Sequence, residues 1–230
     1  YLMCFTFRKY NITPLFVFDG FNISDKKRDE ILKRKEIKMK AKYEYEKIKK
    51  SENIDSDMKE KMNILYKEMV TVTKKTVDIV KNLINACGMK YITAHGEADI
   101  LCSALVKSNK VYACLTEDSD LFVYSCPRVM KYLSLLNHTC LLYDLNKILS
   151  SINITQEDLL NISVLSGTDY NDEISGDIFC NKKYLLEYKN ESINKTFLDW
   201  MLEKKRINCD DIKTICEVKK CYTPDVNKIL

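Results

Sequence analysis

The sequence contains little glycine and proline, with five Gly and three Pro in 230 residues. So few turn-forming residues exclude collagen-like, proline-rich and turn-dense all-β proteins. No run of about 18 apolar residues occurs, so the sequence predicts no membrane span and no membrane partner. No charged segment followed by an apolar stretch opens the chain, as it would in a secretory signal. Hydrophobic residues nevertheless make up 46% of the chain, which is enough to bury a sizeable core.

Histidine is also scarce, and the ten cysteines form no Cys-x-x-Cys pair. Two histidines cannot complete a common zinc site with cysteines that are spaced in this way. Most of the cysteines lie inside apolar runs. We therefore expect reduced thiols in a reducing, intracellular compartment.

The positive charge is concentrated in one segment. Residues 26–50 hold twelve Lys or Arg and five Asp or Glu, a local charge of +7 in a chain whose net charge is +4. The rest of the chain is therefore slightly acidic. A basic block on such a body indicates a polyanionic partner contacted by one element, and a solvated, salt-bridged helix face is the alternative.

Short apolar segments alternate with helical patterns along the chain. The pattern predicts a buried strand at residues 14–20 and a long helix at residues 24–50, capped by Ser24. It predicts a second long helix at residues 57–87, which ends at Gly88. Further strands are expected at 89–93, 110–116, 128–134 and 139–144, and further helices at 96–106, from 144, from Thr155 and within 182–230. This alternation predicts an α/β fold with a mainly parallel central sheet flanked by helices.

Acidic residues recur where a predicted strand ends or the next helix begins. They are Asp19, Glu97, Asp99, Asp118, Asp120 and Asp169. Each has an ordinary structural explanation, because carboxylates stabilise helix N-termini and polar turns. Taken together they are more informative, because the carboxyl ends of strands in open α/β sheets are where ligands bind.

Six carboxylates at one edge of a sheet would repel one another unless cations neutralised them. A ligand set made only of oxygens selects hard ions such as Mg²⁺ or Mn²⁺. Two such ions about 4 Å apart can activate a water and stabilise the leaving oxygen of a phosphodiester. With a basic segment to hold phosphate, the sequence predicts a metal-dependent nuclease.

Three segments carry a family resemblance: PLFVFDG, GEADILCSALVKSNKVYACLTEDSD and LLNISVLSGTDY. They resemble the conserved blocks of the flap endonuclease family, the XPG-like structure-specific 5′ nucleases. The middle block is the most specific, with Glu-x-Asp, eighteen residues, then Asp-x-Asp. The resemblance implies a PIN-like 5′ nuclease fold, with a nuclease core over 1–170, a helical arch at about 24–87, and a divergent helical DNA-binding region over 171–230.

The resemblance also implies roles for individual residues. Asp19, Glu97, Asp99 and Asp118 match ligands of a first Mg²⁺, and Asp120 and Asp169 match ligands of a second, with Mn²⁺ as a substitute. The family uses a Lys and an Arg of the arch on the scissile phosphate. Lys27 and Arg34 fit best, with Lys26 and Lys33 as rivals; the seven-residue spacing puts Lys27 and Arg34 on one helix face.

The sequence departs from the family pattern in two places. The family has an additional catalytic Asp and a glycine before the first strand, and neither occurs here. We therefore expect this sequence to be a piece of a longer protein, and we expect the piece alone to be poorly active. After GTDY, Gly176 matches the glycine-rich helix-two-turn-helix, but the second glycine is replaced around 178–180. We expect weakened binding of duplex and potassium there, with Lys182 and Lys183 as compensating charges.

The implied substrate is DNA with a 5′ single-stranded flap or gap, cut during replication or repair by a monomer. The implied location is where DNA is replicated, in the nucleus or a viral replication compartment. The Lys-, Asn- and Ile-rich composition suggests an AT-rich genome, such as that of a large DNA virus or a protist. No sliding-clamp motif is found. Three alternatives remain open: a 5′→3′ RNA exonuclease, a junction resolvase, or a catalytically degenerate nucleic-acid-binding scaffold.

Overall fold

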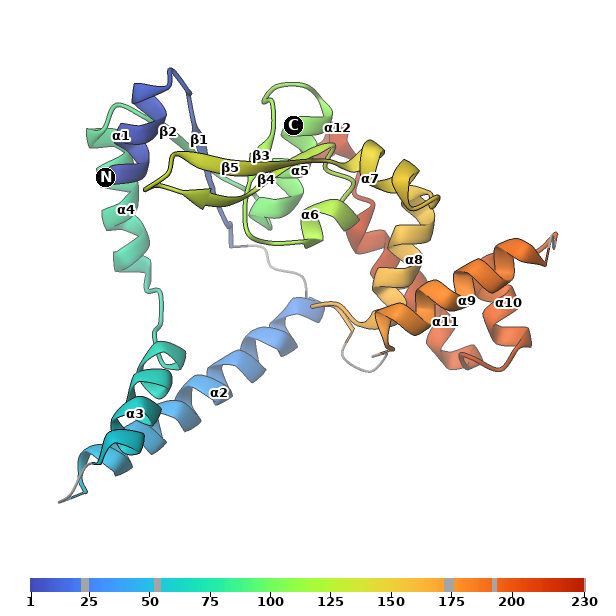
Figure 1. Cartoon of the computed structure of the whole chain (residues 1–230), viewed down its shortest axis with the longest axis horizontal. Helices are drawn as coiled ribbons and strands as arrows, with labels where there is room; N and C mark the ends of the chain where they lie inside the picture. Colours follow the sequence, from blue (N-terminus) through green and yellow to red (C-terminus); the bar gives the residue numbers. More distant parts are fainter. Residues whose placement is uncertain (22–24, 52–54, 172–175, 192–193, 230) are drawn as a thin grey trace. The chain divides into compact units, whose positions relative to one another are not determined.

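A computed structural model describes residues 1–21, 25–51, 55–171, 176–191 and 194–229 (Figure 1). The chain divides into two compact units. The first comprises Tyr1–Ile23 with Lys90–Leu230, and the second comprises Ser24–Met89. The predicted cap at Ser24 lies outside the described residues.

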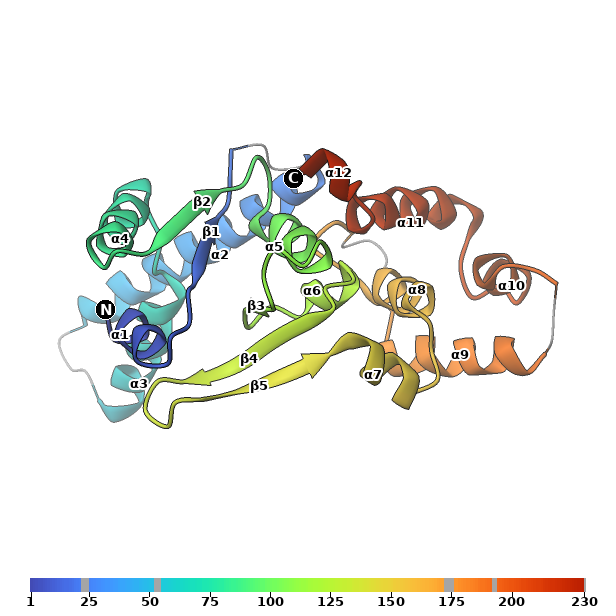
Figure 2. The ribbon, with the colours of Figure 1, turned by 90° about the horizontal axis from the view of Figure 1, so that it is seen from above.

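The first unit contains two small sheets. Strand β1 (Leu15–Phe18) pairs in parallel with β2 (Lys90–Thr93). Strand β3 (Cys114–Leu115) pairs in parallel with β4 (Arg128–Ser134), which pairs antiparallel with β5 (Thr139–Asp144). Helix α5 (Ala98–Lys107) contacts both β1 and β3 (Figure 2). The α/β class is confirmed, but the predicted single sheet is two sheets among the described residues, because only two residues of the predicted 110–116 strand pair with β4.

The chain is tightly held where β1 and β2 end. Ala94 N donates to the Phe18 carbonyl at 2.8 Å, and Gly20 N donates to the Gly96 carbonyl at 2.7 Å. A Cβ on Gly20 would overlap the Ala94 carbonyl oxygen, so only glycine allows the two segments to approach this closely. This contact fixes the backbone that carries Asp19.

The largest core lies among the C-terminal helices. It is built around α8 (Gln156–Ser166), α9 (Ile178–Asn190), α10 (Phe197–Glu203) and α11 (Cys209–Tyr222). The predicted helix start at Thr155 is confirmed. Thr155 Oγ1 accepts from Asp158 N at 3.1 Å, and Asp158 Oδ2 accepts from Thr155 N at 2.7 Å, which makes a reciprocal capping box. The shorter helices are α1 (Leu2–Lys9), α6 (Asp120–Val123), α7 (Leu145–Ser151) and α12 (Val226–Ile229).

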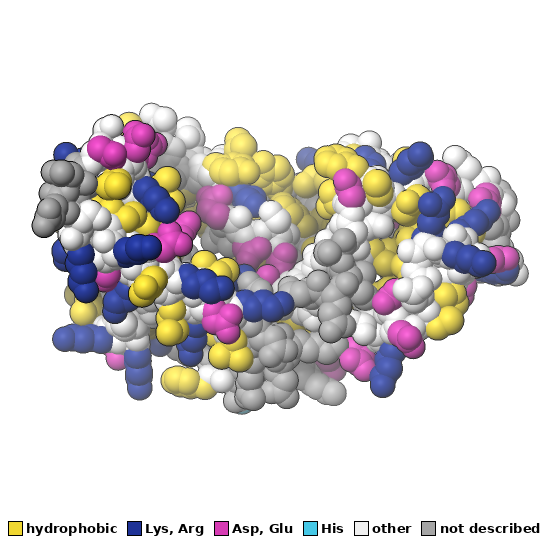
Figure 3. All heavy atoms as spheres, turned by 90° about the horizontal axis from the view of Figure 1, so that it is seen from below, with side chains coloured by type: hydrophobic (Ala, Val, Ile, Leu, Met, Phe, Trp, Pro, Cys, Tyr) yellow, Lys and Arg dark blue, Asp and Glu magenta, His cyan; other side chains and the backbone are white. Residues whose placement is uncertain are grey.

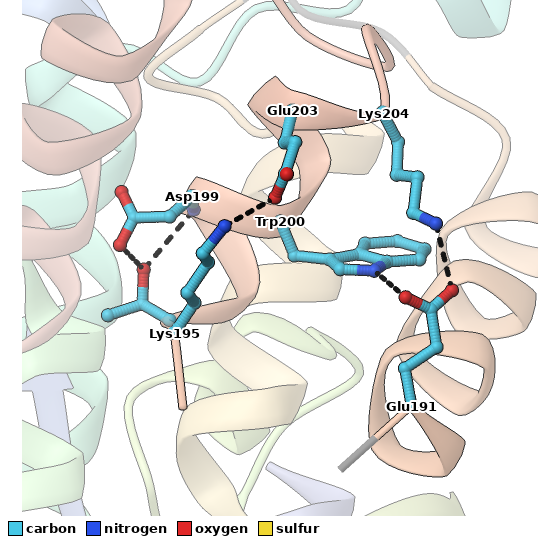
Figure 4. Close-up of polar contacts among 7 residues, drawn as sticks. Glu191, Lys195, Asp199, Trp200, Glu203 and Lys204 are labelled. Carbon is cyan, nitrogen blue, oxygen red and sulfur yellow. Dashed lines mark hydrogen bonds and ion pairs between the residues drawn. The ribbon is translucent and has the colours of Figure 1, made fainter. Parts of the chain in front are cut away.

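Polar contacts join the end of α9 to α10 (Figure 4). The indole Nε1 of Trp200 donates to Glu191 Oε2 at 2.9 Å, and Lys204 Nζ pairs with the other oxygen of Glu191 at 3.0 Å. A second pair, Lys195–Glu203, lies 2.8 Å apart on the exposed side of α10. The buried indole is therefore held through its polar atom as well as by packing.

The second unit consists of helices α2 (Asp25–Lys49), α3 (Ser56–Glu68) and α4 (Lys74–Ala86). Helix α2 packs along α3, with an ion pair of 3.2 Å between Lys61 and Glu44 and ring centroids of Tyr45 and Tyr66 6.2 Å apart. The predicted long exposed helix over 24–50 is confirmed as α2.

The predicted single helix over 57–87 is wrong, because it is interrupted between α3 and α4. The interruption has the sequence Met-Val-Thr-Val-Thr, whose β-branched residues lose side-chain freedom in a helix. Thr73 then starts α4, since its side chain accepts from Thr76 N at 3.2 Å. The predicted end at Gly88 is confirmed by its φ of 68°.

All ten cysteines carry thiols. Cys4, Cys114 and Cys126 are buried, whereas Cys140, Cys180, Cys209 and Cys216 are exposed. Among the described helices, none combines the length and the apolar character needed to cross a membrane.

Candidate active site

Asp19 lies against the first turn of α5. Its Oδ1 accepts a hydrogen bond from Ala98 N at 2.8 Å, across 79 residues of sequence. A carboxylate at a helix N-terminus satisfies an unpaired backbone N–H and is stabilised by the helix dipole. The structure thereby brings Asp19 to the segment that carries Glu97 and Asp99.

Glu97 immediately precedes α5 and is only 8% exposed. Its Oε2 accepts a hydrogen bond from the hydroxyl of Tyr170 at 2.9 Å, and that hydroxyl is 2.5 Å from the hydroxyl of Tyr124. Burial raises the pKa of both Tyr124 and Tyr170 far above the usual range, so both phenols stay protonated. Neither tyrosine was predicted from the sequence, although Tyr170 directly follows Asp169.

Asp118 and Asp120 lie in the turn between β3 and α6. Asp118 Oδ1 accepts from Asp120 N at 2.9 Å, which is the ordinary turn interaction expected for such a residue. Asp120 begins α6, and its Oδ2 accepts a hydrogen bond from the Tyr222 hydroxyl at 3.0 Å. Because Tyr222 is the last residue of α11, a C-terminal helix reaches this turn.

Two hydrogen bonds join strand β4 to the same turn. Tyr132 N donates to Glu117 Oε1 at 2.7 Å, and Lys131 Nζ donates to Ser119 Oγ at 2.9 Å. Lys131 is only 7% exposed. No local sequence signal distinguishes this lysine from other strand residues, so it could not be predicted from the sequence.

Asp169 lies, partly buried, in the turn that follows α8. Thr168 donates through both its N and its Oγ1 to Asn171 Oδ1, at 3.0 and 2.8 Å. Asn171 is buried and donates through Nδ2 to the Val164 carbonyl at 3.0 Å. Thr168 and Asn171 therefore make the turn that carries Asp169.

The donor set fits a hard divalent cation, since it consists of carboxylate oxygens. The described side chains, however, contain no group of three or more His, Cys, Asp or Glu that could hold a metal ion. The contacts instead join Asp19 to the start of α5 and Asp118 to Asp120. A metal centre formed by all six carboxylates stays a prediction.

Lys27 and Arg34 both lie on α2, where Lys27 is partly buried and Arg34 is exposed. The rival Lys33 is exposed on the same helix, and the side chain of Lys26 lies outside the described residues. These basic residues belong to the second unit, whereas the six carboxylates belong to the first. On the face drawn in Figure 3, Lys and Arg side chains are interspersed with hydrophobic and acidic ones.

Comparison with known proteins identifies related chains. The XPG I-region family model matches residues 88–169, which include five of the six carboxylates. Flap endonuclease 1 of Methanococcus aeolicus is 34% identical over 223 residues, which cover 95% of this chain and 64% of that relative. The chain thus spans less than two thirds of this curated relative.

Two solved structures have the same fold. The flap endonuclease-1 of Methanococcus jannaschii has a TM-score of 0.63 at 24% identity, covering 96% of this chain and 66% of that one. The catalytic core of Rad2 in complex with DNA substrate has a TM-score of 0.62 at 23% identity, covering 96% of this chain and 68% of that one. The PIN-like 5′ nuclease architecture is therefore confirmed. The family model covers the segments that carry five of the six carboxylates, and the Methanococcus aeolicus relative aligns with 95% of this chain, so the chain is similar to the flap endonuclease/XPG-like family.

Proposed function

We propose that the protein is a metal-dependent, structure-specific 5′ nuclease that hydrolyses phosphodiesters of flap or gapped DNA in replication or repair. The observation that carries this proposal is the hydrogen bond from Ala98 N to Asp19, which brings the carboxylate after β1 to the acidic start of α5. The similarity to the XPG I-region and to flap endonuclease 1 supports the same reaction.

We assign two groups of ligands within this function. Asp19, Glu97, Asp99 and Asp118 would hold one cation, and Asp120 and Asp169 the other. Mg²⁺, or Mn²⁺ in its place, supplies an activated water and stabilises the leaving oxygen when bound. Lys27 and Arg34 would contact the scissile phosphate through charge-assisted hydrogen bonds.

The remaining assignments concern the whole protein. We assign residues 1–170 to the nuclease core, with the arch at about 24–87, and residues 171–230 to duplex binding. The basic segment 26–50 would grip the single strand through phosphate contacts, which makes binding sensitive to salt. The protein would act as a monomer, in the nucleus or a viral replication compartment.

The test incubates the intact protein with a 5′-flap duplex, in Mg²⁺ and then in EDTA. We expect cutting at the flap base in Mg²⁺ only. Asp120→Asn should abolish cutting while fluorescence anisotropy in EDTA shows unchanged binding of the flap. Asp210→Asn, the same change on an exposed residue of α11, is the matched control and should cut normally. Normal cutting by Asp120→Asn would contradict the proposal.

Substrate class is decided by a parallel assay. A single-stranded RNA, the 5′-flap duplex and a four-way junction are incubated side by side with the intact protein. We expect the flap to be cut fastest. Faster cutting of RNA or of the junction would assign the protein to the corresponding alternative activity.

A nucleic-acid-binding scaffold is the second candidate. The altered segment after GTDY favours it, because the second glycine expected there is replaced around 178–180. Mutual repulsion of the six carboxylates argues against the scaffold, because a protein that binds no cation gains nothing from such repulsion. Calorimetric titration of the intact protein with Mg²⁺ separates the two, since the scaffold predicts no binding heat.

A further inference from the structure

We propose that Tyr222 and Tyr170 are positioning residues, which orient Asp120 and Glu97 through a buried set of three phenols. This set, called here the tyrosine cluster, consists of Tyr124, Tyr170 and Tyr222. The inference rests on the proposed function, because it assigns the cluster a role toward two of the proposed cation ligands.

The hydroxyl groups form a directed set of hydrogen bonds. Tyr170 donates to Glu97 Oε2 at 2.9 Å, and Tyr222 donates to Asp120 Oδ2 at 3.0 Å. A phenol has one proton to donate. Since Tyr170 uses its proton on Glu97, Tyr124 must donate to Tyr170 across the 2.5 Å between their oxygens. Two phenol protons therefore point at two different carboxylates.

Packing holds the three rings in place. The ring centroid of Tyr222 lies 4.8 Å from that of Tyr124 and 5.2 Å from that of Tyr170. The side chains are 2%, 6% and 1% exposed for Tyr124, Tyr170 and Tyr222. All three belong to the hydrophobic core formed with the C-terminal helices. Their hydroxyls cannot turn away without disturbing that core.

These hydrogen bonds do more than give the buried hydroxyl groups a partner, because they also orient the carboxylates of Glu97 and Asp120. A carboxylate can accept several hydrogen bonds, so accepting one from a phenol leaves it able to bind a cation. Metal-ligating side chains are typically oriented by such partners, whose loss weakens metal affinity about 10- to 100-fold. The two carboxylates belong to different proposed cation sites, so one rigid cluster would set the relative orientation of both.

The test compares Tyr222→Phe and Tyr170→Phe with Tyr188→Phe. Tyr188 is the matched control because its hydroxyl also donates a hydrogen bond, to the Lys195 carbonyl at 2.6 Å, and its ring packs on Phe197 and Trp200. Each intact variant is titrated with Mn²⁺ by calorimetry. Thermal unfolding is followed without metal, and flap cleavage is measured as a function of Mn²⁺ concentration.

We expect Tyr222→Phe and Tyr170→Phe each to bind Mn²⁺ about tenfold more weakly than the parent, and saturating Mn²⁺ to restore most of kcat. KM for the flap should not change. Tyr188→Phe should bind Mn²⁺ as tightly as the parent, even if its melting temperature is lower. A purely structural role predicts the opposite, a lower melting temperature with unchanged Mn²⁺ affinity, and that result would overturn the inference.

Asp120→Asn separates this inference from the function on which it rests. If it weakens Mn²⁺ binding and abolishes cutting while the two tyrosine variants behave as the parent, the positioning role is wrong and the nuclease proposal survives. If the parent binds no Mn²⁺, or Asp120→Asn binds it equally well, the proposed function fails and the positioning role fails with it.

Discussion

The ammonium group of Lys131 donates a hydrogen bond to the hydroxyl of Ser119 at 2.9 Å, and Ser119 lies between Asp118 and Asp120. A nearly buried cation on β4 thus holds the middle of the acidic turn. Ser119→Ala removes the acceptor and should lower the free energy of unfolding by about 1–3 kcal/mol, because a buried charged donor loses its partner. Urea denaturation measures this loss.

Ser151→Ala is the control for this prediction. Ser151 is exposed, as Ser119 is, and its hydroxyl also makes a hydrogen bond, to the Ile148 carbonyl at 2.7 Å, but that partner is an uncharged backbone group of its own helix. Its removal should cost no more than about 0.5 kcal/mol, as surface substitutions usually do. Equal losses for the two variants would show that Lys131 gains nothing from Ser119.

Asp158 should make stability depend on pH in the acid range. Burial raises the pKa of its carboxyl, but hydrogen bonds from Lys189 and Thr155 outweigh burial and hold the pKa below the usual value. Its stabilisation is therefore complete above about pH 4, the ordinary carboxyl pKa, and is lost as the pH falls through the lower pKa of the folded state. Asp158→Asn should be less stable than the parent by about 1–2 kcal/mol at pH 7.

The gap between Asp158→Asn and the parent should narrow as the pH drops below about 4. Urea unfolding at pH 7, 5 and 3 measures it. Asp210→Asn, on an exposed carboxylate of α11, serves as the control. A gap that stays constant between pH 7 and pH 3 would show that the charge of Asp158 does not contribute.

Gly20→Ala should destabilise the first unit. The added Cβ would overlap the Ala94 carbonyl oxygen and lie 2.6 Å from that of His95, and neither backbone atom can move freely. We expect a loss of about 1–3 kcal/mol, the usual cost of overpacking. Thermal unfolding measures it, with Phe21→Ala as the control because Phe21 is 88% exposed. Unchanged stability of Gly20→Ala would mean that the segment of Gly20 and the segment of Ala94 and His95 leave room for a Cβ atom.

Arg34→Ala tests the assignment of α2 to the scissile phosphate. A charge-assisted hydrogen bond contributes about 1.5–3 kcal/mol, so kcat for flap cleavage should fall roughly 10- to 100-fold. Lys35→Ala removes the same charge from the next, exposed position of α2 and should change kcat by less than about twofold. Similar losses in both variants would indicate a general electrostatic effect of the basic segment.

Local signals made most of the fold predictable. The apolar run before Asp19, the Lys- and Glu-rich helix, the cap at Thr155 and the glycine after α4 each depend on neighbours within a few residues. The interruption between α3 and α4 was missed because the apolar residues on both sides keep helical spacing, and only the run of β-branched residues marks the end of α3. The division into two sheets depends on strand pairing, which sequence patterns do not determine.

The carboxylates could be found from the sequence, but their partners could not. Asp120 and Tyr222 are 102 residues apart, and Glu97 and Tyr170 are 73 apart. No periodic pattern connects positions so far apart, since their contact follows from how α11 and the turn after α8 pack. The tyrosines resemble ordinary core residues in the sequence, and only their hydroxyl contacts distinguish them.

Because the thiols differ in burial, the rates at which they are modified report local opening of the folded protein. A maleimide reagent should modify Cys140, Cys180, Cys209 and Cys216 at once, because all four are exposed. Cys114 and Cys126 are buried in one cluster with Val106 of α5 and Val129 of β4, so they react only when that region opens. Mass spectrometry of the slowly labelled sites would therefore give the free energy of opening near the acidic turn, in the folded protein and with no cysteine introduced by mutation.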